Sequence, residues 1–217
     1  TLPLGEIKIK RKIRSLDIIL KTCTGVNLVS QNKKRIFEHK KSEYTFRTIN
    51  SLLKSLKKSK QNINNIDFKI TIIDAGSSKE DKETMREILE KSKLKFNFIE
   101  LNLSDYLQRI KVIKKDNPQI ENNMKSTMAS IIKSFEISKN SDDLVYFVED
   151  DYIHSDDCIS EMLSVYEKFS TILEDEIFIV PVDYPYLYQK NSSTNILIGQ
   201  KYHWRSVKES LLTFLTS

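Results

Sequence analysis

The sequence predicts an α/β protein with a mostly parallel central sheet that is flanked by helices on both faces. Short apolar runs alternate with segments of helical periodicity along most of the chain, which is typical of this class. Three of the runs stop at polar clusters, and ligands of such sheets bind beyond the carboxyl ends of the strands. The 217 residues are enough for one domain with a sizeable core, so we expect a single domain over residues 1–217. Truncation at the C-terminus is left open, since the chain ends in apolar sequence.

The first half of the chain supplies three of the expected strands. Apolar residues run together at residues 16–20, 68–73 and 95–101. The helix after the first strand has apolar residues at helical spacing: Phe46, Ile49, Leu52, Leu53 and Leu56. A second helix begins at Ser78, which forms a capping-box pattern with Asp81, and its predicted core residues are Met85, Ile88 and Leu89.

The second half continues the alternation. Leu103, Leu107 and Ile110 predict a helix that ends before a polar break at residues 116–118. The next helix, from about residue 123 to 137, has these residues on one face: Met124, Met128, Ile131, Ile132 and Phe135. A fourth strand is expected at residues 144–148, and later strands at 177–182 and 196–199. Between them Ser155 is expected to cap a helix that buries Ile159, Met162, Leu163, Tyr166 and Phe169.

Charge and cysteine content narrow the class of protein. The net charge is +5, and basic residues gather at 8–14, 33–41 and 54–60. They suit anionic partners such as nucleotides, nucleic acid or a membrane surface, and solvated lysine-rich faces explain each cluster equally well. Cys23 and Cys158 lack the spacing of a zinc site or a disulfide framework, which favours inert thiols in a reducing cytoplasm.

The sequence shows neither a membrane span nor an export signal. No apolar run approaches the roughly 20 residues that cross a bilayer, and no signal peptide is visible. We therefore expect a cytoplasmic protein, and leave open a peripheral contact with the inner membrane surface.

Three polar clusters fall at the carboxyl ends of expected strands, at residues 22–24, 74–78 and 149–151. Asp74 suits a hydrogen bond to a sugar hydroxyl or base edge of a nucleotide, or alternatively an Asx-turn that serves only the backbone. Thr22 and Thr24 either offer hydroxyls to the same ligand or simply end their strand. If the strands are parallel, all three clusters face one edge of the sheet.

The third cluster consists of the consecutive acids Glu149, Asp150 and Asp151. Their carboxylates repel one another, and a divalent cation relieves the repulsion. Mg²⁺ and Mn²⁺ prefer oxygen ligands, often one or two carboxylates together with substrate phosphates and water. A solvated strand end is the alternative, but we favour a metal site.

Five segments together resemble a glycosyltransferase of the GT-A type, close to family 2: "IILKTCT", "FRTINSLLKSL", "ITIIDAGSS", "NNMKSTMASIIKSFEIS" and "LVYFVEDDYI". The resemblance spans roughly residues 16–190 and implies a Rossmann-like fold. It implies that Asp151 binds the metal on the diphosphate of the donor, in an EDD variant of the DxD motif. It also implies that Glu149 or Asp150 contacts the ribose or donor sugar, and that Asp74 and the first strand hold the nucleoside. The chain has Lys21 where the family often has arginine, which leaves the donor open.

An inverting transfer also needs a general base on the acceptor hydroxyl. Asp183 follows the expected strand at 177–182 and is our candidate. Tyr184, His203, Trp204 and Arg205 are candidate acceptor-binding residues, because aromatic and polar side chains together suit sugar faces. Half-buried packing is the alternative for the tyrosine, and a structural role is the alternative for the histidine.

The sequence therefore predicts a metal-dependent glycosyltransferase with Mn²⁺ or Mg²⁺ as cofactor. The expected donor is a nucleotide-diphosphate sugar, and the acceptor a glycan or a lipid-linked molecule such as a cell-surface polysaccharide precursor. We expect inversion, with retention left open, and no nucleic-acid partner, since the basic clusters lack interleaved aromatic residues.

Three alternatives remain. A methyltransferase would use "IIDAGSS" as a cofactor turn, but the turn is poor in glycine. A nucleotidyltransferase would explain the acids, but no glycine-rich basic loop is present near the N-terminus. The third is a non-catalytic nucleotide-binding module.

Overall fold

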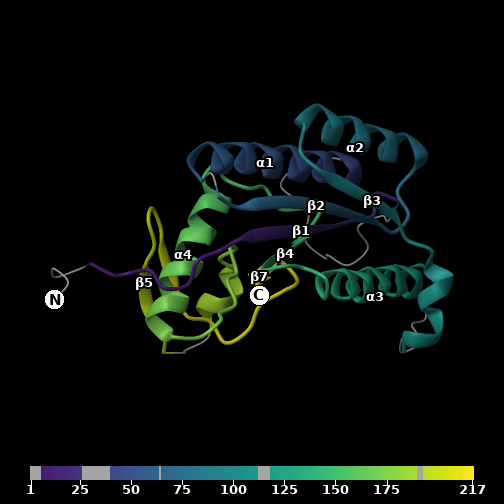
Figure 1. The fold of residues 1–217 in the computed structure, drawn as a ribbon. Coiled ribbons are helices and arrows are strands. Elements are labelled where there is room, and N and C mark those ends of the chain that lie inside the picture. Colours follow the sequence, from purple (N-terminus) through teal and green to yellow (C-terminus); the bar gives the residue numbers. More distant parts are fainter. Residues whose placement is uncertain (1–5, 26–39, 64, 112–117, 190–192) are drawn as a thin grey trace.

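The structure, a computed structural model, describes residues 6–25, 40–63, 65–111, 118–189 and 193–217. Its centre is a five-stranded sheet in the order β3-β2-β1-β4-β7, in which the first four strands are parallel and β7 is antiparallel (Figure 1). These strands are β1 (Ser15–Thr22), β2 (Asp67–Asp74), β3 (Phe96–Glu100), β4 (Leu144–Glu149) and β7 (Phe214–Thr216). A separate hairpin pairs β5 (Ile196–Ile198) with β6 (His203–Arg205).

Helices cover both faces of the sheet. They are α1 (Lys41–Asn62), α2 (Lys79–Ser92), α3 (Pro118–Ser138) and α4 (Cys158–Leu173), with short 3₁₀ helices η1 (Leu103–Arg109) and η2 (Pro185–Gln189). Figure 1 shows α1 and α2 on one side of the sheet and α3 on the other. The predicted fold class is therefore confirmed: a Rossmann-like α/β fold with a mostly parallel sheet and helices on both faces.

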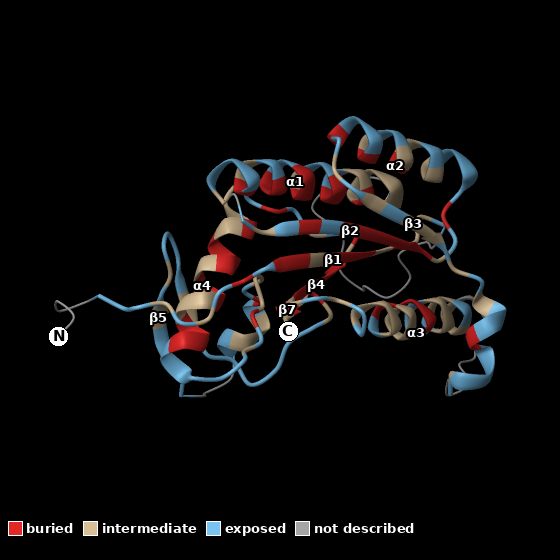
Figure 2. Ribbon diagram, in the orientation of Figure 1, coloured by how far each residue is buried: buried red, intermediate tan, exposed pale blue. Residues whose placement is uncertain are grey.

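The period-two alternation of the strands explains this layering. In β1, Leu16, Ile18 and Leu20 join the large core beneath α1, α2 and α4, whereas Ile19 points to the opposite face. All four are at most 1% exposed, and the strands appear as the buried centre in Figure 2. A strand buried on both faces reads as a continuous apolar run, which is why the sequence predicted these strands well.

Helix α3 differs from the expectation. The side chains that it buries are small, namely Ala129, Ser130 and Ser134, while Met128 and Phe135 of the predicted apolar face are 44% and 47% exposed. Small side chains let the helix lie close to the sheet, so the apolar face turns partly outward. The segment with Leu103 and Leu107 also differs, because it forms the 3₁₀ helix η1.

Two capping predictions had opposite outcomes. The Ser78 hydroxyl accepts a hydrogen bond from the Asp81 backbone N–H at 3.1 Å, which confirms the cap of α2. Ser155 was wrong as the cap of α4, since the helix begins at Cys158 behind Asp157, with no side-chain cap. The Ser155 carbonyl instead accepts from the Cys158 N–H.

The two later strands also need correction. Only one bridge, between Ile179 and Leu215 of β7, forms in the segment 177–182. Residues 196–198 pair with β6 and lie outside the central sheet. The unpredicted strand β7 occupies the edge beside β4, where it pairs through only three residues.

Two further sequence predictions concern the basic clusters and the absence of a membrane span. The predicted basic cluster at residues 33–41 lies outside the described residues except for Lys40 and Lys41. None of the helices in the described part of the chain combines the length and apolar character that crossing a bilayer requires.

Candidate functional site

The three polar clusters meet at one edge of the sheet, as the parallel arrangement predicted. Thr22 is in register with Asp74, and Lys21 with Glu149. Direct contacts join the clusters: the Cys23 N–H donates to Asp150 at 3.2 Å, and the Thr24 N–H donates to the Ser77 hydroxyl at 2.9 Å. The ends of β1, β2 and β4 thus form one polar surface.

Asp74 organises the turn after β2. It is only 2% exposed, and its carboxylate accepts from the Thr22 hydroxyl at 2.9 Å and from the N–H groups of Gly76 and Ser77 at 3.3 and 3.0 Å. This is the geometry of the Asx-turn alternative. A direct contact between Asp74 and a nucleoside stays a prediction, and the turn itself offers the surface for that contact.

The turns after β1 and β2 pack tightly against each other. A Cβ on Gly25 would lie 2.3 Å from the Gly76 carbonyl oxygen, so only glycine fits there. The Thr24 hydroxyl donates to Asp81 at 2.6 Å, in the first turn of α2. Thr22 and Thr24 therefore fix the shape of this part of the site through their side chains.

The Asp150 carboxylate is engaged in contacts with other residues of the protein. One oxygen accepts from Lys41 Nζ at 2.5 Å, and the other from the Thr45 hydroxyl at 2.8 Å and the Cys23 N–H. The Asp150 and Lys41 side chains are 11% and 13% exposed. The carboxylate therefore ties the start of α1 to the ends of β1 and β4, a role that the sequence did not reveal.

Asp150→Ala is expected to destabilise the fold by about 3–5 kcal/mol, because it leaves the Lys41 ammonium buried without its partner. Urea denaturation at neutral pH measures this free energy of unfolding. Asp156→Ala is the matched control, since Asp156 pairs with Lys54 through side chains that are 45% and 69% exposed. Equal losses in the two variants would contradict the structural role of Asp150.

Glu149 lies half-buried beside Lys21, whose Nζ is 3.5 Å from Glu149 Oε1. Burial raises the pKa of Glu149, and the charges of Asp151 and Asp150 raise it further against the opposing effect of Lys21. Burial lowers the pKa of Lys21, against the effect of Glu149. Both shifts disfavour the charged forms, and a further cation close to these acids would stabilise their ionised carboxylates.

The carboxylate oxygens at this site are better suited to a metal ion that binds together with a ligand than to a metal ion that the protein binds alone. Among the described residues, no group of three or more His, Cys, Asp or Glu side chains is arranged to hold an ion. Asp151 is exposed at the turn after β4, with Glu149 two residues before it, whereas Asp150 is taken by Lys41. One or two carboxylates at a site that is open to phosphates suit Mg²⁺ or Mn²⁺.

Aromatic side chains border the acids. The Tyr152 hydroxyl is 2.8 Å from the Tyr184 hydroxyl, and Tyr184 stacks on Tyr186 with ring centroids 5.7 Å apart. Burial raises the pKa of both Tyr152 and Tyr184, so their hydroxyls stay protonated and neutral. Tyr184 was predicted, and Tyr152 was missed because its pairing partner is 32 residues away.

The position of Asp183 depends on the direction of the segment that leads to it from Ile179. Ile179 pairs antiparallel with β7, and β7 is antiparallel to β4, so the segment runs in the direction of β4. The Asp183 carboxylate accepts from Arg205 Nη2 at 2.7 Å and Nε at 3.2 Å, and from the Tyr188 hydroxyl. Burial raises the pKa of Asp183, but these hydrogen bonds outweigh it and lower the pKa below its ordinary value.

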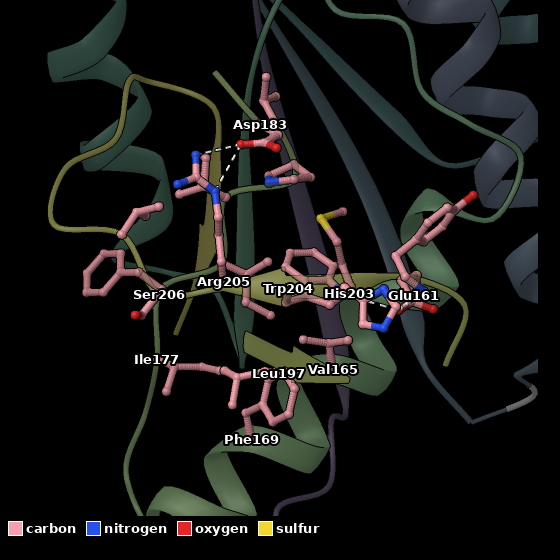
Figure 3. Close-up of a pocket in the computed structure, with 18 of the residues that line it drawn as sticks. Glu161, Val165, Phe169, Ile177, Asp183, Leu197, His203, Trp204, Arg205 and Ser206 are labelled. Carbon is pink, nitrogen blue, oxygen red and sulfur yellow. Dashed lines mark hydrogen bonds and ion pairs between the residues drawn. The ribbon is translucent and has the colours of Figure 1, made fainter. Parts of the chain in front are cut away.

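The hairpin holds the remaining predicted residues. The Trp204 indole N–H donates to Glu161 at 3.2 Å, and Glu161 also accepts from the N–H groups of residues 200, 201 and 202 (Figure 3). Glu161 is 2% exposed and fastens the hairpin to α4. The structure thus brings Asp183 and Arg205 together, anchors Trp204, and leaves His203 exposed.

His154 follows the acidic cluster and is 7% exposed. Its Nε2 lies 3.0 Å from the Tyr146 hydroxyl, and its Nδ1 has no hydrogen-bond partner among the described residues. Burial lowers the pKa of His154 from 6.5 to about 4. The neutral ring is therefore part of the folded state.

Stability is expected to fall between pH 6.5 and pH 4, because the unfolded chain binds a proton at His154 that the folded chain excludes. The loss from this group is on the order of 3 kcal/mol. Denaturation across this pH range should show a steeper slope for the wild type than for His154→Phe. His203→Phe, at an exposed position, is the control, and a His154→Phe slope equal to that of the wild type would contradict the expectation.

Comparison with known proteins adds little. No protein-family model matches the chain, and no curated protein matches it. Among the solved structures that match is a crystal structure of TarS 1–349 from S. aureus, with 15% sequence identity and a TM-score of 0.37. The match covers 76% of this chain and 34% of that one, so this chain spans about a third of its length. A likeness this slight carries no argument about activity.

Proposed function

We propose that this protein is a metal-dependent glycosyltransferase that moves a sugar from a nucleotide-diphosphate sugar to an acceptor hydroxyl. The observation that carries the proposal is the meeting of three strand ends at one edge of a Rossmann-like sheet, with Glu149 and Asp151 at its mouth. In such sheets this edge is where nucleotides bind. The neighbouring carboxylates of Glu149 and Asp151 supply the negative charge that attracts a divalent cation.

On the donor side, the turns after β1 and β2 hold the nucleoside. Thr22, Thr24 and Asp74 act chiefly by fixing the shape of these turns, and the N-terminus of α2 faces the same edge. Asp151 is the metal ligand, with Glu149 beside it for the ribose, the donor sugar or the same ion. The Mn²⁺ or Mg²⁺ ion, when bound, neutralises the charge that develops on the diphosphate leaving group.

On the acceptor side, Asp183 takes the proton from the attacking hydroxyl. That hydroxyl displaces the nucleoside diphosphate in one step from the opposite face of the donor sugar, which makes the transfer inverting. Arg205 orients the carboxylate through two hydrogen bonds. Because Arg205 and Tyr188 help lower the pKa of Asp183, the carboxylate is ionised near neutral pH, as a base must be. Tyr184 offers an aromatic face between this group and the acids.

Thermal unfolding with a panel of nucleotide-diphosphate sugars tests the proposal. Each sugar is added with Mn²⁺, with chelator, and with Mn²⁺ plus an excess of chelator. Sugar and metal together should stabilise the protein by about 2.7 kcal/mol at 100 times the dissociation constant, and either alone by much less. Stabilisation by S-adenosylmethionine or by an oligonucleotide, and by no nucleotide sugar, would overturn the assignment.

A further inference from the structure

A large cavity lies beside the acceptor residues. Its volume is about 820 Å³, and its walls are α4, the segment 177–183 and the β5–β6 hairpin (Figure 3). Binding pockets for small molecules commonly measure about 300–1,000 Å³. Ile153, two residues beyond Asp151, also lines it, and the hydrogen bond between the Tyr152 and Tyr184 hydroxyls joins the residue after Asp151 to the residue after Asp183.

The cavity changes in polarity along its length. Figure 3 shows Asp183 and Arg205 together at one end, and Val165, Phe169, Ile177 and Leu197 toward the other. All four of these apolar side chains line the cavity, so this end of it is apolar. The Glu161 carboxylate, which also lines the wall, is already satisfied by four N–H groups. Glu161 is thus not available to a ligand, whereas the ion pair of Asp183 and Arg205 supplies charged groups at its own end of the cavity.

Apolar side chains also remain uncovered around this cavity. Phe178 and Ile153 are each 73% exposed, and Ile196 is 62% exposed. Exposed apolar surface of this extent commonly marks a binding site. Because these apolar side chains surround a concave space and do not form a flat face, they suit an apolar chain better than the surface of a folded protein.

We propose that this cavity binds the apolar chain of an amphiphilic acceptor, with its polar head at Asp183 and Arg205. A single alkyl or isoprenoid chain matches the change in polarity, and the head group then lies beside the acids that hold the donor. The acceptor role rests on the proposed function, whereas binding of the chain does not. The expected acceptor is thus a lipid-linked hydroxyl compound rather than a water-soluble glycan.

Trp204 provides a direct measurement, because it is the only tryptophan in the sequence and lines the cavity. A series of alkyl β-glucosides with increasing chain length is titrated below the micelle threshold, without donor or metal. The Trp204 emission should shift to shorter wavelength as the chain displaces water. Affinity should rise about fourfold for each added methylene group. Affinity that does not depend on chain length would overturn the proposal.

Neighbouring residues of β5 supply matched variants. Leu197 lines the cavity, whereas the neighbouring Ile198 does not line it and is 65% exposed. Leu197→Asp should abolish the chain-length dependence, and Ile198→Asp should keep it. Should Leu197→Asp fail to fold, Leu197→Phe replaces it and should weaken long chains more than short ones. Equal losses in the variants at both positions would mean nonspecific binding and would contradict the proposal.

The remaining outcomes separate this inference from the proposed function. Dimerisation that Leu197→Asp abolishes, without chain-length dependence, would assign the cavity to a second copy of the chain and overturn the proposal. If chain-length dependence holds but no nucleotide sugar binds with metal, the glycosyltransferase assignment fails and the apolar site stands. If both hold, transfer to the longest glucoside should exceed transfer to glucose by at least the ratio of their affinities.

Discussion

Asp151→Ala is expected to abolish metal-dependent binding of the nucleotide sugar and to leave the stability of the ligand-free protein unchanged or slightly higher. Asp151 is exposed at the turn after β4, next to two other acids. Its charge raises the pKa of Glu149, so its removal relieves repulsion in the ligand-free state. With a metal and a diphosphate present, the same change removes a ligand of the ion.

The measurement is donor affinity with Mn²⁺ and with chelator, by calorimetry. In the wild type the metal should strengthen binding, and in Asp151→Ala the two affinities should agree. Asp156→Ala removes a partly exposed acid five residues further along and should behave as the wild type does. Metal dependence that survives in Asp151→Ala would remove this residue as the ligand.

Asp150 and Asp151 show how neighbouring residues of one motif divide its roles. The Asp150 side chain is buried and bound to Lys41, Thr45 and Cys23, whereas Asp151 is exposed. Asp150→Ala is expected to lower stability, and Asp151→Ala to lower metal-dependent binding. The sequence shows three equivalent acids, because the partners that distinguish them are more than 100 residues away in the chain.

The central parallel strands β1 and β4 were predictable because each is buried on both faces, which leaves an uninterrupted apolar run. The order of β1, β2 and β4 along the chain and their parallel direction then bring Thr22, Asp74 and Glu149 to one edge without further information. The segment 177–182 is equally apolar but forms one bridge with Leu215. Within this segment only Ile179 is fully buried and Phe178 is 73% exposed, so its apolar residues form a wall of the cavity beside α4 and the hairpin and not a strand of the sheet.

The sequence did not predict the start of α4 at Cys158 or the contacts of Glu161 with the hairpin, and the reasons differ. Ser155 has the chemistry of a cap, but the turn of residues 155–158 places the helix start two residues later than a Ser155 cap would. Glu161 reads as an ordinary helical acid, yet it is buried by a hairpin about 40 residues away. A Cβ on Gly199 would lie 2.1 Å from its carboxylate, and only the structure reveals that approach.

Asp183→Asn is expected to keep donor and metal binding and to lower the rate of transfer by about 10²–10⁴-fold, the usual loss of a general base. The amide keeps the shape of the carboxylate but loses its charge and its basicity. It also loses the ion pair with Arg205, in which Nη2 lies 2.7 Å from the carboxylate. Asp183 is exposed, so little stability should be lost.

Transfer and donor hydrolysis are measured together for Asp183→Asn and for Arg205→Gln. Arg205 helps to lower the pKa of Asp183, so in Arg205→Gln that pKa rises. The carboxylate then becomes protonated at a higher pH. The pH at which the rate falls on the acid side of the profile should therefore rise, a change that a purely structural role would not produce. Asp175→Asn, at an exposed acid outside this cluster, is the control. If Asp183→Asn transfers within a few-fold of the wild type, Asp183 is not the base, and His203 becomes the next candidate because it also lines the cavity beside Arg205.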